Sequence, residues 1–416
     1  MLIPAGSAFS QGFATLGGGV AGWIYATIVY NGQLIAAGDC PGHIARWDGA
    51  VWQPLGTGLD GRVNALAVYQ GNLYAGGQFF TAGGVPVSCI AYWNGAGWND
   101  PEGGVGNIVA SLTVYGGQLI VGGYFTSADG SPGNYIARWD GNGWNVLGTG
   151  MGGTQGQVMA LTVWNNQLIA GGFFDTAGGN PAPHIAAWNG SAWSSIGGGI
   201  GWIVYALTPY NGNLIAGGLF SSAGGNPAQD VARWNGSTWA EVGNGGIGGG
   251  VYGYVLALTV VGNELIAGGM FEHAGGNPAM NIAGWNGSSW APLGSGMSNS
   301  GSTTAVCALT PFGTGFAAGG IFTAGDAVGS ANIIAWNGPV PHVSLQPITD
   351  LTAIPLGGNI VLRWSRMGNP AFHVYTDAAV NGTYTTLVTA TTDTFATVSS
   401  PAAAQGFYVV KGADAP

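Results

Sequence analysis

The residues of this sequence that could carry acid–base, metal or nucleophilic chemistry are few and scattered. The 416 residues include 5 His, 3 Cys and 17 Asp or Glu. The histidines lie far apart, at His43, His184, His273, His342 and His373. General acid–base catalysis requires titratable groups that converge on one substrate, and zinc motifs place Cys and His at short spacings that this chain lacks. We therefore predict no catalytic residues and no metal site, and we expect that the protein is not an enzyme.

Four carboxylates fall in predicted loops, at Asp39, Asp175, Glu272 and Asp326. A ring of such groups could hold Ca²⁺ through oxygen ligands. The chain has no D-x-D-x-D-G calcium loop. Bound calcium is therefore an alternative that the sequence does not indicate, and we expect no cofactor.

Three arginines occupy one equivalent position in a repeated segment. Arg46, Arg138 and Arg233 each stand immediately before a Trp. Successive side chains of a strand point to opposite faces, so each Arg lies on the side of its strand opposite that Trp. We expect a structural pair with a neighbouring carboxylate or with backbone carbonyls, and recognition of a ligand is the alternative.

The segment that contains these arginines recurs seven times. Each copy has an apolar strand that ends in a small-residue pair, usually Gly-Gly, then a short loop and a strand that ends in Trp-Asn-Gly or Trp-Asp-Gly. The first Trp residues of the copies, 46 to 51 residues apart, are Trp47, Trp93, Trp139, Trp188, Trp234, Trp285 and Trp336. This period with strand chemistry is typical of a β-propeller with one four-stranded blade per repeat. We predict an all-β chain in which residues 1–340 form a seven-bladed β-propeller.

The two ends of the repeat region complement each other. Phe13–Gly17 matches the last strand of the other copies but has no preceding strands of its own, whereas the copy at Trp336 lacks a second Trp. We therefore expect the N-terminal strand to close the last blade, because closure removes exposed strand edges. Exchange of this strand between molecules is the alternative.

The repeat resembles the kelch repeat over about residues 11–340. Both have an apolar strand, a glycine pair, an aromatic residue on the third strand and a Trp that opens the fourth strand, although this chain has Trp rather than Tyr on the third strand. The resemblance implies the fold and leaves activity open, since the family includes binding scaffolds and a few enzymes. Independently, we expect the glycine pairs to allow close approach of neighbouring backbone.

The period stops near residue 341. Strand-like runs within Asp350–Trp364, at His373–Tyr375 and at Phe407–Val410 predict a small β-sandwich over residues 341–416. A Leu-Thr opening strand, a Leu-x-Trp strand and a closing Phe-Tyr-Val-Val resemble the fibronectin type III family. Such modules usually act as spacers or as contacts between surface proteins.

One face of the propeller is the predicted ligand-binding face. It carries the loops after the glycine pairs and the blade-to-blade loops, where length and aromatic content vary most. The candidate ligand-binding residues there are Trp23, Trp202, Tyr252 and Tyr254. The alternative is that these aromatic side chains only pack between blades.

The low content of charged residues and the net negative charge bear on which functions this protein can have. Only 6% of residues are charged, the net charge is −10, and no apolar run of about 20 residues that could span a membrane is present. A basic face for nucleic acid is therefore not expected. We expect an extracellular or cell-surface structural or adhesive protein that forms a homo-oligomer or filament, or contacts other surface proteins. The alternatives are a lectin-like propeller that binds glycans or peptides, and a hydrolase or lyase with a site at the channel mouth.

Overall fold

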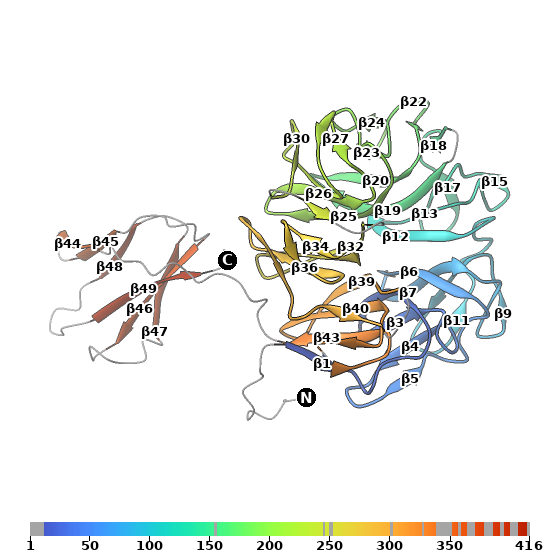
Figure 1. Ribbon diagram of the computed structural model, residues 1–416. Helices are drawn as coiled ribbons and strands as arrows, with labels where there is room; N and C mark the ends of the chain where they lie inside the picture. Colours follow the sequence, from blue (N-terminus) through green and yellow to red (C-terminus); the bar gives the residue numbers. More distant parts are fainter. Residues whose placement is uncertain are drawn as a thin grey trace. The chain divides into compact units, whose positions relative to one another are not determined.

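The computed structural model describes residues 12–153, 156–243, 246–248, 253–299, 303–326 and 328–337, and then 352–356, 359–363, 371–377, 386–391, 395–399 and 407–413 (Figure 1). The chain divides into two compact units, Met1–Val340 and Pro341–Pro416. Every regular element among the described residues is a strand, as predicted. The described part of the chain contains no helix of the length and apolarity that crossing a membrane requires.

The first unit contains seven four-stranded antiparallel sheets, each one blade of a β-propeller (Figure 1). In the first six blades the strands follow chain order from the inside of the ring outward. Blades 1 to 3 are β2 (Ile24–Tyr30), β3 (Gln33–Gly38), β4 (Ile44–Trp47) and β5 (Trp52–Pro54); β6 (Arg62–Tyr69), β7 (Asn72–Gln78), β10 (Ile90–Trp93) and β11 (Trp98–Asn99); and β12 (Val109–Tyr115), β13 (Gln118–Gly123), β16 (Ile136–Trp139) and β17 (Trp144–Val146). Blades 4 to 6 are β19 (Gln157–Trp164), β20 (Gln167–Phe173), β23 (Ile185–Trp188) and β24 (Trp193–Ser195); β25 (Val204–Tyr210), β26 (Asn213–Gly218), β29 (Val231–Trp234) and β30 (Trp239–Glu241); and β32 (Tyr254–Val261), β33 (Glu264–Met270), β36 (Ile282–Trp285) and β37 (Trp290–Pro292).

The seventh blade closes the ring as predicted. Its strands β39 (Ala305–Phe312), β40 (Gly315–Ile321) and β43 (Ile333–Asn337) are completed by β1 (Gly12–Thr15) of the same chain. In this antiparallel pairing Phe13 lies opposite Trp336, and their ring centroids are 4.8 Å apart. The inner strands β39 and β2 also adjoin, and the hydroxyls of Thr27 and Thr310 are 2.7 Å apart. The circle therefore closes at both its inner and its outer strands.

Each pair of Trp residues holds the end of the preceding blade. The second Trp donates its indole N–H to a backbone carbonyl of that blade, at 2.8–3.0 Å, in the pairs Trp52–Leu16, Trp98–Leu55, Trp144–Glu102, Trp193–Leu147, Trp239–Ile196 and Trp290–Val242. At five of these six junctions the glycine after the carbonyl packs on the first Trp, whereas Gly103, after Glu102, faces Asp129. A Cβ at Gly56 would come within 2.8 Å of the Trp93 ring, and one at Gly197 within 2.1 Å of the Trp234 ring. The Trp pairs therefore lie between blades and join them.

The glycine pairs have two different roles. A Cβ at Gly76 would meet the Val109 side chain of the next blade at 2.4 Å, whereas one at Gly77 would meet the Arg62 carbonyl of its own blade at 2.0 Å. The expected approach of backbone therefore holds for the second glycine. The first glycine instead leaves room for a side chain, because a Val on the inner strand of the next blade packs directly against the backbone of this glycine.

The loops that follow the glycine pairs form short hairpins in six blades. They are β8 (Thr81–Ala82) with β9 (Val85–Pro86), β14 (Ser127–Ala128) with β15 (Ser131–Pro132), β21 (Thr176–Ala177) with β22 (Asn180–Pro181), β27 (Ser222–Ala223) with β28 (Asn226–Pro227), β34 (His273–Ala274) with β35 (Asn277–Pro278), and β41 (Ala324–Gly325) with β42 (Val328–Gly329). The segment that follows the preceding blade pairs with each of them. It does so as a strand in three cases, β18 (Met151–Gly152), β31 (Ile247–Gly248) and β38 (Met297–Ser298), and through a single bridge residue in the others, Leu59, Val105 and Ile200. These hairpins are therefore part of the connection between blades.

The second unit contains two three-stranded antiparallel sheets. One has the order β44 (Thr352–Leu356), β45 (Asn359–Arg363) and β48 (Phe395–Ser399), and the other has the order β47 (Thr386–Thr391), β46 (Ala371–Asp377) and β49 (Phe407–Ala413). The three strand-like runs of the sequence all contain strands here. The sheets adjoin through β47 and β48, an arrangement of the β-sandwich class.

Candidate ligand-binding site

Cavities of similar construction lie between adjacent blades. Their volumes are about 340 Å³ between blades 5 and 6, about 240 Å³ between blades 3 and 4, and about 190 Å³ between blades 2 and 3. Each is lined by the turn after the inner strand, by the second and third strands of one blade and by the first Trp of the next blade. The Trp residues that line them are Trp285, Trp188 and Trp139. The repeat therefore builds the same kind of recess at several junctions.

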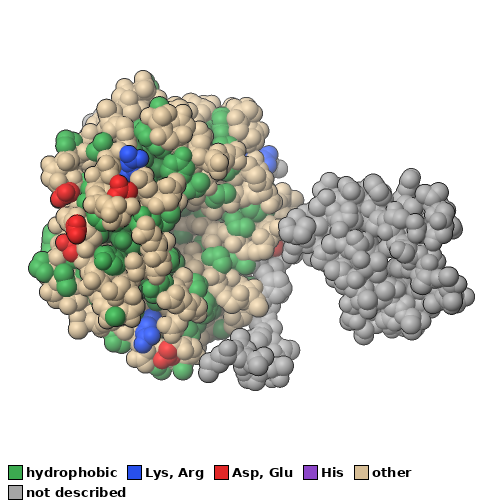
Figure 2. Space-filling model, turned by 180° about the vertical axis from the view of Figure 1, so that it is seen from behind, with side chains coloured by type: hydrophobic (Ala, Val, Ile, Leu, Met, Phe, Trp, Pro, Cys, Tyr) green, Lys and Arg blue, Asp and Glu red, His purple; other side chains and the backbone are tan. Residues whose placement is uncertain are grey.

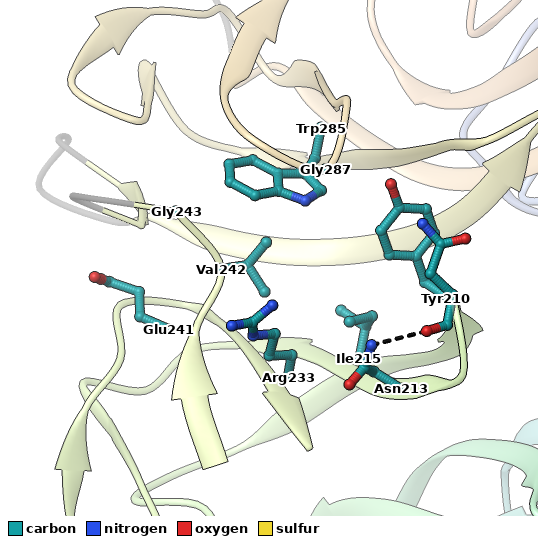
Figure 3. A pocket seen from close by; sticks show the side chains of 10 residues that line it. Tyr210, Asn213, Ile215, Arg233, Glu241, Val242, Gly243, Trp285 and Gly287 are labelled. Carbon is teal, nitrogen blue, oxygen red and sulfur yellow. Dashed lines mark hydrogen bonds between the residues drawn. The ribbon is translucent and has the colours of Figure 1, made fainter. Parts of the chain in front are cut away.

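The cavity between blades 5 and 6 combines an aromatic ring with charged and amide groups. In Figure 3 the guanidinium of Arg233 extends into the space below the indole of Trp285, with Tyr210 and Glu241 on opposite sides. The Tyr210 hydroxyl donates to the carbonyl of Asn263 at 2.9 Å. Burial, with the charge of Glu264 as a smaller cause, raises the pKa of Tyr210 to about 12. The phenol is therefore neutral and is held in place from the next blade.

The cavity between blades 3 and 4 repeats this arrangement with Arg138, Gln118 and Trp188. Arg138 Nη1 donates to Gln118 Oε1 at 3.3 Å. The Nε of Arg138 is buried and has no hydrogen-bond partner among the described residues. A buried donor without an acceptor costs about 1–3 kcal/mol. A ligand oxygen in this cavity could recover that free energy.

Two of the three repeated arginines hydrogen-bond to glutamine side chains and not to the expected carboxylates or backbone carbonyls. Arg46 Nη1 donates to Gln33 Oε1 at 3.4 Å, as Arg138 does to Gln118. Arg233 is exposed, and no side-chain or backbone acceptor lies within hydrogen-bond distance among the described residues. Carboxylates are nevertheless near: backbone hydrogen bonds and, to a smaller degree, the charges of Arg46 and Arg138 lower the pKa of Asp48 and Asp140, and Glu241 lines the same cavity as Arg233. Recognition of a ligand by these arginines stays a prediction.

The cavity between blades 2 and 3 differs in charge from the other two. Its lining contains Tyr92 where the others have an arginine, and it also contains Tyr74, Asp100, Glu102 and Trp139. The Tyr74 and Tyr92 rings stack with centroids 5.2 Å apart. Burial raises the pKa of Asp100, and the charge of Glu102 contributes to the shift. This recess is therefore acidic and aromatic.

The central channel offers little for acid–base chemistry. Its cavity of about 230 Å³ is lined mainly by Ala and Leu of the inner strands, and its titratable lining groups among the described residues are Tyr25, Tyr205 and Cys307. Burial raises the pKa of both Tyr25 and Cys307 to about 12. These groups therefore stay protonated at neutral pH and provide neither a thiolate nor a general base.

The histidines that the structure describes in the propeller, His43, His184 and His273, lie in three different blades. His43 and His184 occupy equivalent positions before the third strand, each with φ of 61°. His43 Nδ1 lies 3.0 Å from the carbonyl of Gly38. The His184 ring stacks on Phe173 at 5.5 Å, and burial lowers its pKa. The described residues contain no group of three His, Cys, Asp or Glu side chains that could hold a metal ion.

The candidate ligand-binding aromatic residues do not line any of these four cavities. Trp23 and Trp202 are 47% and 46% exposed, and Trp202 packs against Phe173 with ring centroids 4.9 Å apart. Tyr254 is half-buried with its ring 6.4 Å from Tyr205. Tyr252 lies outside the described residues. The structure brings these residues into separate small clusters, so their role in binding stays a prediction.

The interblade cavities lie on the face that carries the short turns, opposite to the face expected to bind ligands. Their linings include the Asn211 turn after an inner strand and Gly287 of a Trp-Asn-Gly turn. Near-uniform turns gave no reason to expect a site there. The available signal was the recurrence of arginine in alternate repeats, since each such arginine faces away from the Trp of its own strand.

A match to a protein family agrees with the propeller fold. The family described as "Domain of unknown function (DUF5122) beta-propeller" matches residues 117–143. No curated protein matches the chain.

Among solved structures, the computationally designed Ika8 protein is 16% identical, with 79% of this chain and 99% of that chain covered and a TM-score of 0.47. The WD40 beta propeller domain of Doa1 is 14% identical, with coverage of 78% and 96% and a TM-score of 0.48. An alpha-L-arabinofuranosidase from Clostridium thermocellum is 13% identical, with coverage of 53% and 87% and a TM-score of 0.25.

Proposed function

We propose that this β-propeller is a non-enzymatic binding protein that holds neutral saccharide units in the cavities between its blades. The observation behind this proposal is the repeated combination of a Trp with an arginine, seen with Arg138 and Arg233. At Arg138 the buried Nε also has no hydrogen-bond partner among the described residues. A pyranose presents an apolar face that packs on an indole and hydroxyls that accept from guanidinium N–H groups. Sites of this kind need an aromatic surface and a few well-placed polar groups.

The repeat also supplies multivalency. Two similar cavities on one rigid ring could engage two units of the same glycan, which raises the apparent affinity without new contacts. The neutral amide side chains around the arginines fit neutral saccharides better than phosphorylated ones. Asn213 and Gln118 provide such amides in the two cavities.

A glycan array probed with the purified chain tests this proposal. We expect neutral saccharides to bind and Arg138→Met with Arg233→Met to weaken binding about 10- to 100-fold, because hydrogen bonds to charged groups contribute about 1.5–3 kcal/mol. Met preserves the apolar stem and removes the donors. Trp202→Ala is the matched control on the opposite face and should leave binding unchanged. Binding lost with Trp202→Ala and retained in the arginine variants would refute the assignment of the site.

The scarcity of surface charge favours a second function, a structural or adhesive scaffold. The face shown in Figure 2 has few Lys, Arg, Asp or Glu side chains among many uncharged ones, and 6% of all residues are charged. Weakly repelling surfaces favour association of like molecules. An extracellular or cell-surface homo-oligomer or filament built from kelch-like blades and a fibronectin type III-like module would fit this composition. A monomeric mass at every protein concentration in multi-angle light scattering would count against this second function.

A further inference from the structure

The junction of blades 2 and 3 combines aromatic rings with two carboxyl side chains in one recess. Backbone N–H groups of Gly103 and Glu102 hydrogen-bond to Asp100 and partly oppose the rise of its pKa that burial causes. Tyr74, Tyr92 and Trp139 line the cavity together with Asp100 and Glu102. No Lys or Arg is among its lining residues. The ligand that suits this cavity is therefore chemically different from one that suits an arginine-lined cavity.

The carboxylate of Asp100 lacks a counter-ion. Its Oδ1 atom is buried with no hydrogen-bond partner among the described residues. Within the same part of the chain, the ion pair found joins Arg62 to Asp39 and involves neither Asp100 nor Glu102. Burial of an unpaired carboxylate oxygen is unfavourable, and a cation in the cavity would reduce that cost.

Glu102 adds a negative charge at a position where other blades have glycine. Its φ is 55°, close to the 65° of Gly56 and the 55° of Gly197, which end blades 1 and 4. A side chain in this left-handed conformation costs about 1–3 kcal/mol. The carbonyl of Glu102 accepts from the indole N–H of Trp144 at 3.0 Å, whereas at the other junctions the acceptor is the residue before the glycine, as with Leu55 before Gly56. Glycine would adopt this left-handed conformation with less strain and would offer the same backbone carbonyl. The feature that glutamate adds is therefore its carboxylate.

The aromatic side chains provide the complementary surface. Tyr74 and Tyr92 form a stacked pair with centroids 5.2 Å apart, and Trp139 is 5% exposed. Burial raises the pKa of Tyr74 to about 12, so its ring stays a neutral phenol. The negative faces of such rings attract cations, most strongly where water is excluded.

We propose that the cavity between blades 2 and 3 binds an organic ammonium group, with Asp100 and Glu102 neutralising its charge and Trp139 and Tyr92 contacting its alkyl groups. The observations behind this site are independent of saccharide binding at the other cavities. Failure of every saccharide on the array would therefore leave it unaffected.

Isothermal titration of the full chain with tetramethylammonium chloride tests the site. Sodium chloride keeps the ionic strength constant, and neopentyl alcohol serves as the uncharged analogue of similar shape. We expect saturable binding of tetramethylammonium and none of neopentyl alcohol. Equal binding of both compounds, or no binding of tetramethylammonium, would overturn the proposal.

Two variants connect the binding to the carboxylates. Glu102→Gly introduces the residue that other blades use, so we expect unchanged or raised thermal stability with at least fivefold weaker tetramethylammonium binding. Asp100→Asn should weaken binding by a similar factor, and Arg233→Met at the other cavity should leave it unchanged. Undiminished affinity in a folded Glu102→Gly variant would show that the carboxylate is not part of a cation site.

Discussion

Asp230 is a buried carboxyl at a position where the next two blades carry asparagine. It is 0% exposed, and it stands before the third strand, as do Asn281 and Asn332. Asp230 Oδ1 accepts from the backbone N–H of Phe220 at 3.0 Å. Burial raises the pKa of Asp230 to about 6, although hydrogen bonds from Phe220 and Gln229 partly oppose the shift. The folded protein therefore holds this proton more tightly than the unfolded chain.

The sign and size of the stability effect follow from this shift. Because the pKa is raised on folding, stability from this group is fully present below the unfolded pKa of about 3.8 and is lost as pH rises through about 6. A shift of about 2 units corresponds to about 3 kcal/mol between these limits. Across an accessible range of about pH 4.5 to 7.5, the loss is about 2 kcal/mol.

Asp230→Asn should remove this dependence. Asn332 shows that an amide fits the position, since its Oδ1 accepts from the Phe322 N–H at 3.3 Å and its Nδ2 donates to the Val20 carbonyl at 3.1 Å. We expect the difference in free energy of unfolding, variant minus wild type, to increase by about 2 kcal/mol from pH 4.5 to 7.5 in urea titrations followed by Trp fluorescence.

The reciprocal change provides the control. Asn332→Asp places a carboxyl at an equivalent position, so it should destabilise the protein more at pH 7.5 than at pH 4.5. A difference between Asp230→Asn and wild type that does not vary with pH would refute the reasoning, because it would show that the carboxyl ionises normally in the folded state.

Two other changes test the junctions between blades. Trp98→Phe removes the indole N–H that donates to the Leu55 carbonyl at 3.0 Å, and leaving a buried carbonyl unpaired should lower the free energy of unfolding by about 1–3 kcal/mol, measured by urea denaturation. Gly197→Ala places a Cβ 2.1 Å from the Trp234 ring at φ of 55° and should lower the melting temperature by several degrees, since a loss of about 1 kcal/mol shifts it by about 2–4 °C even in domains of roughly 150–250 residues and the overlap here costs more. Gly97→Ala, where a Cβ would meet nothing within 4 Å, is the control, and an equal loss there would contradict the steric explanation.

Much of the architecture could be predicted because each repeat contains its own local signals. Turns such as Asn211-Gly212, with φ of 46° and 76°, join the inner strands as Asn-Gly sequences predict. The unmatched strand at Phe13 and the missing second Trp after Trp336 together predicted the closure that the pairing of these residues shows.

The candidate site could not be found in the same way. The sequence shows arginines at one repeat position, but the cavity beside each arginine is completed by the first Trp of the following repeat, as with Arg233 and Trp285. The partners of those arginines also depend on packing between strands, which is why Gln33 and Gln118 were not expected.

The sequence by itself determined the number of repeats, the strands within them and the N-terminal strand that closes the ring. It could do so because turn residues and the alternation of apolar and polar residues along a strand act over a few positions. Only the tertiary structure decided which side chains share a recess. Asp100 and Glu102 meet Trp139 because the curvature of the closed ring brings the end of one blade against the next, and a relation across blades has no signature in the local sequence pattern.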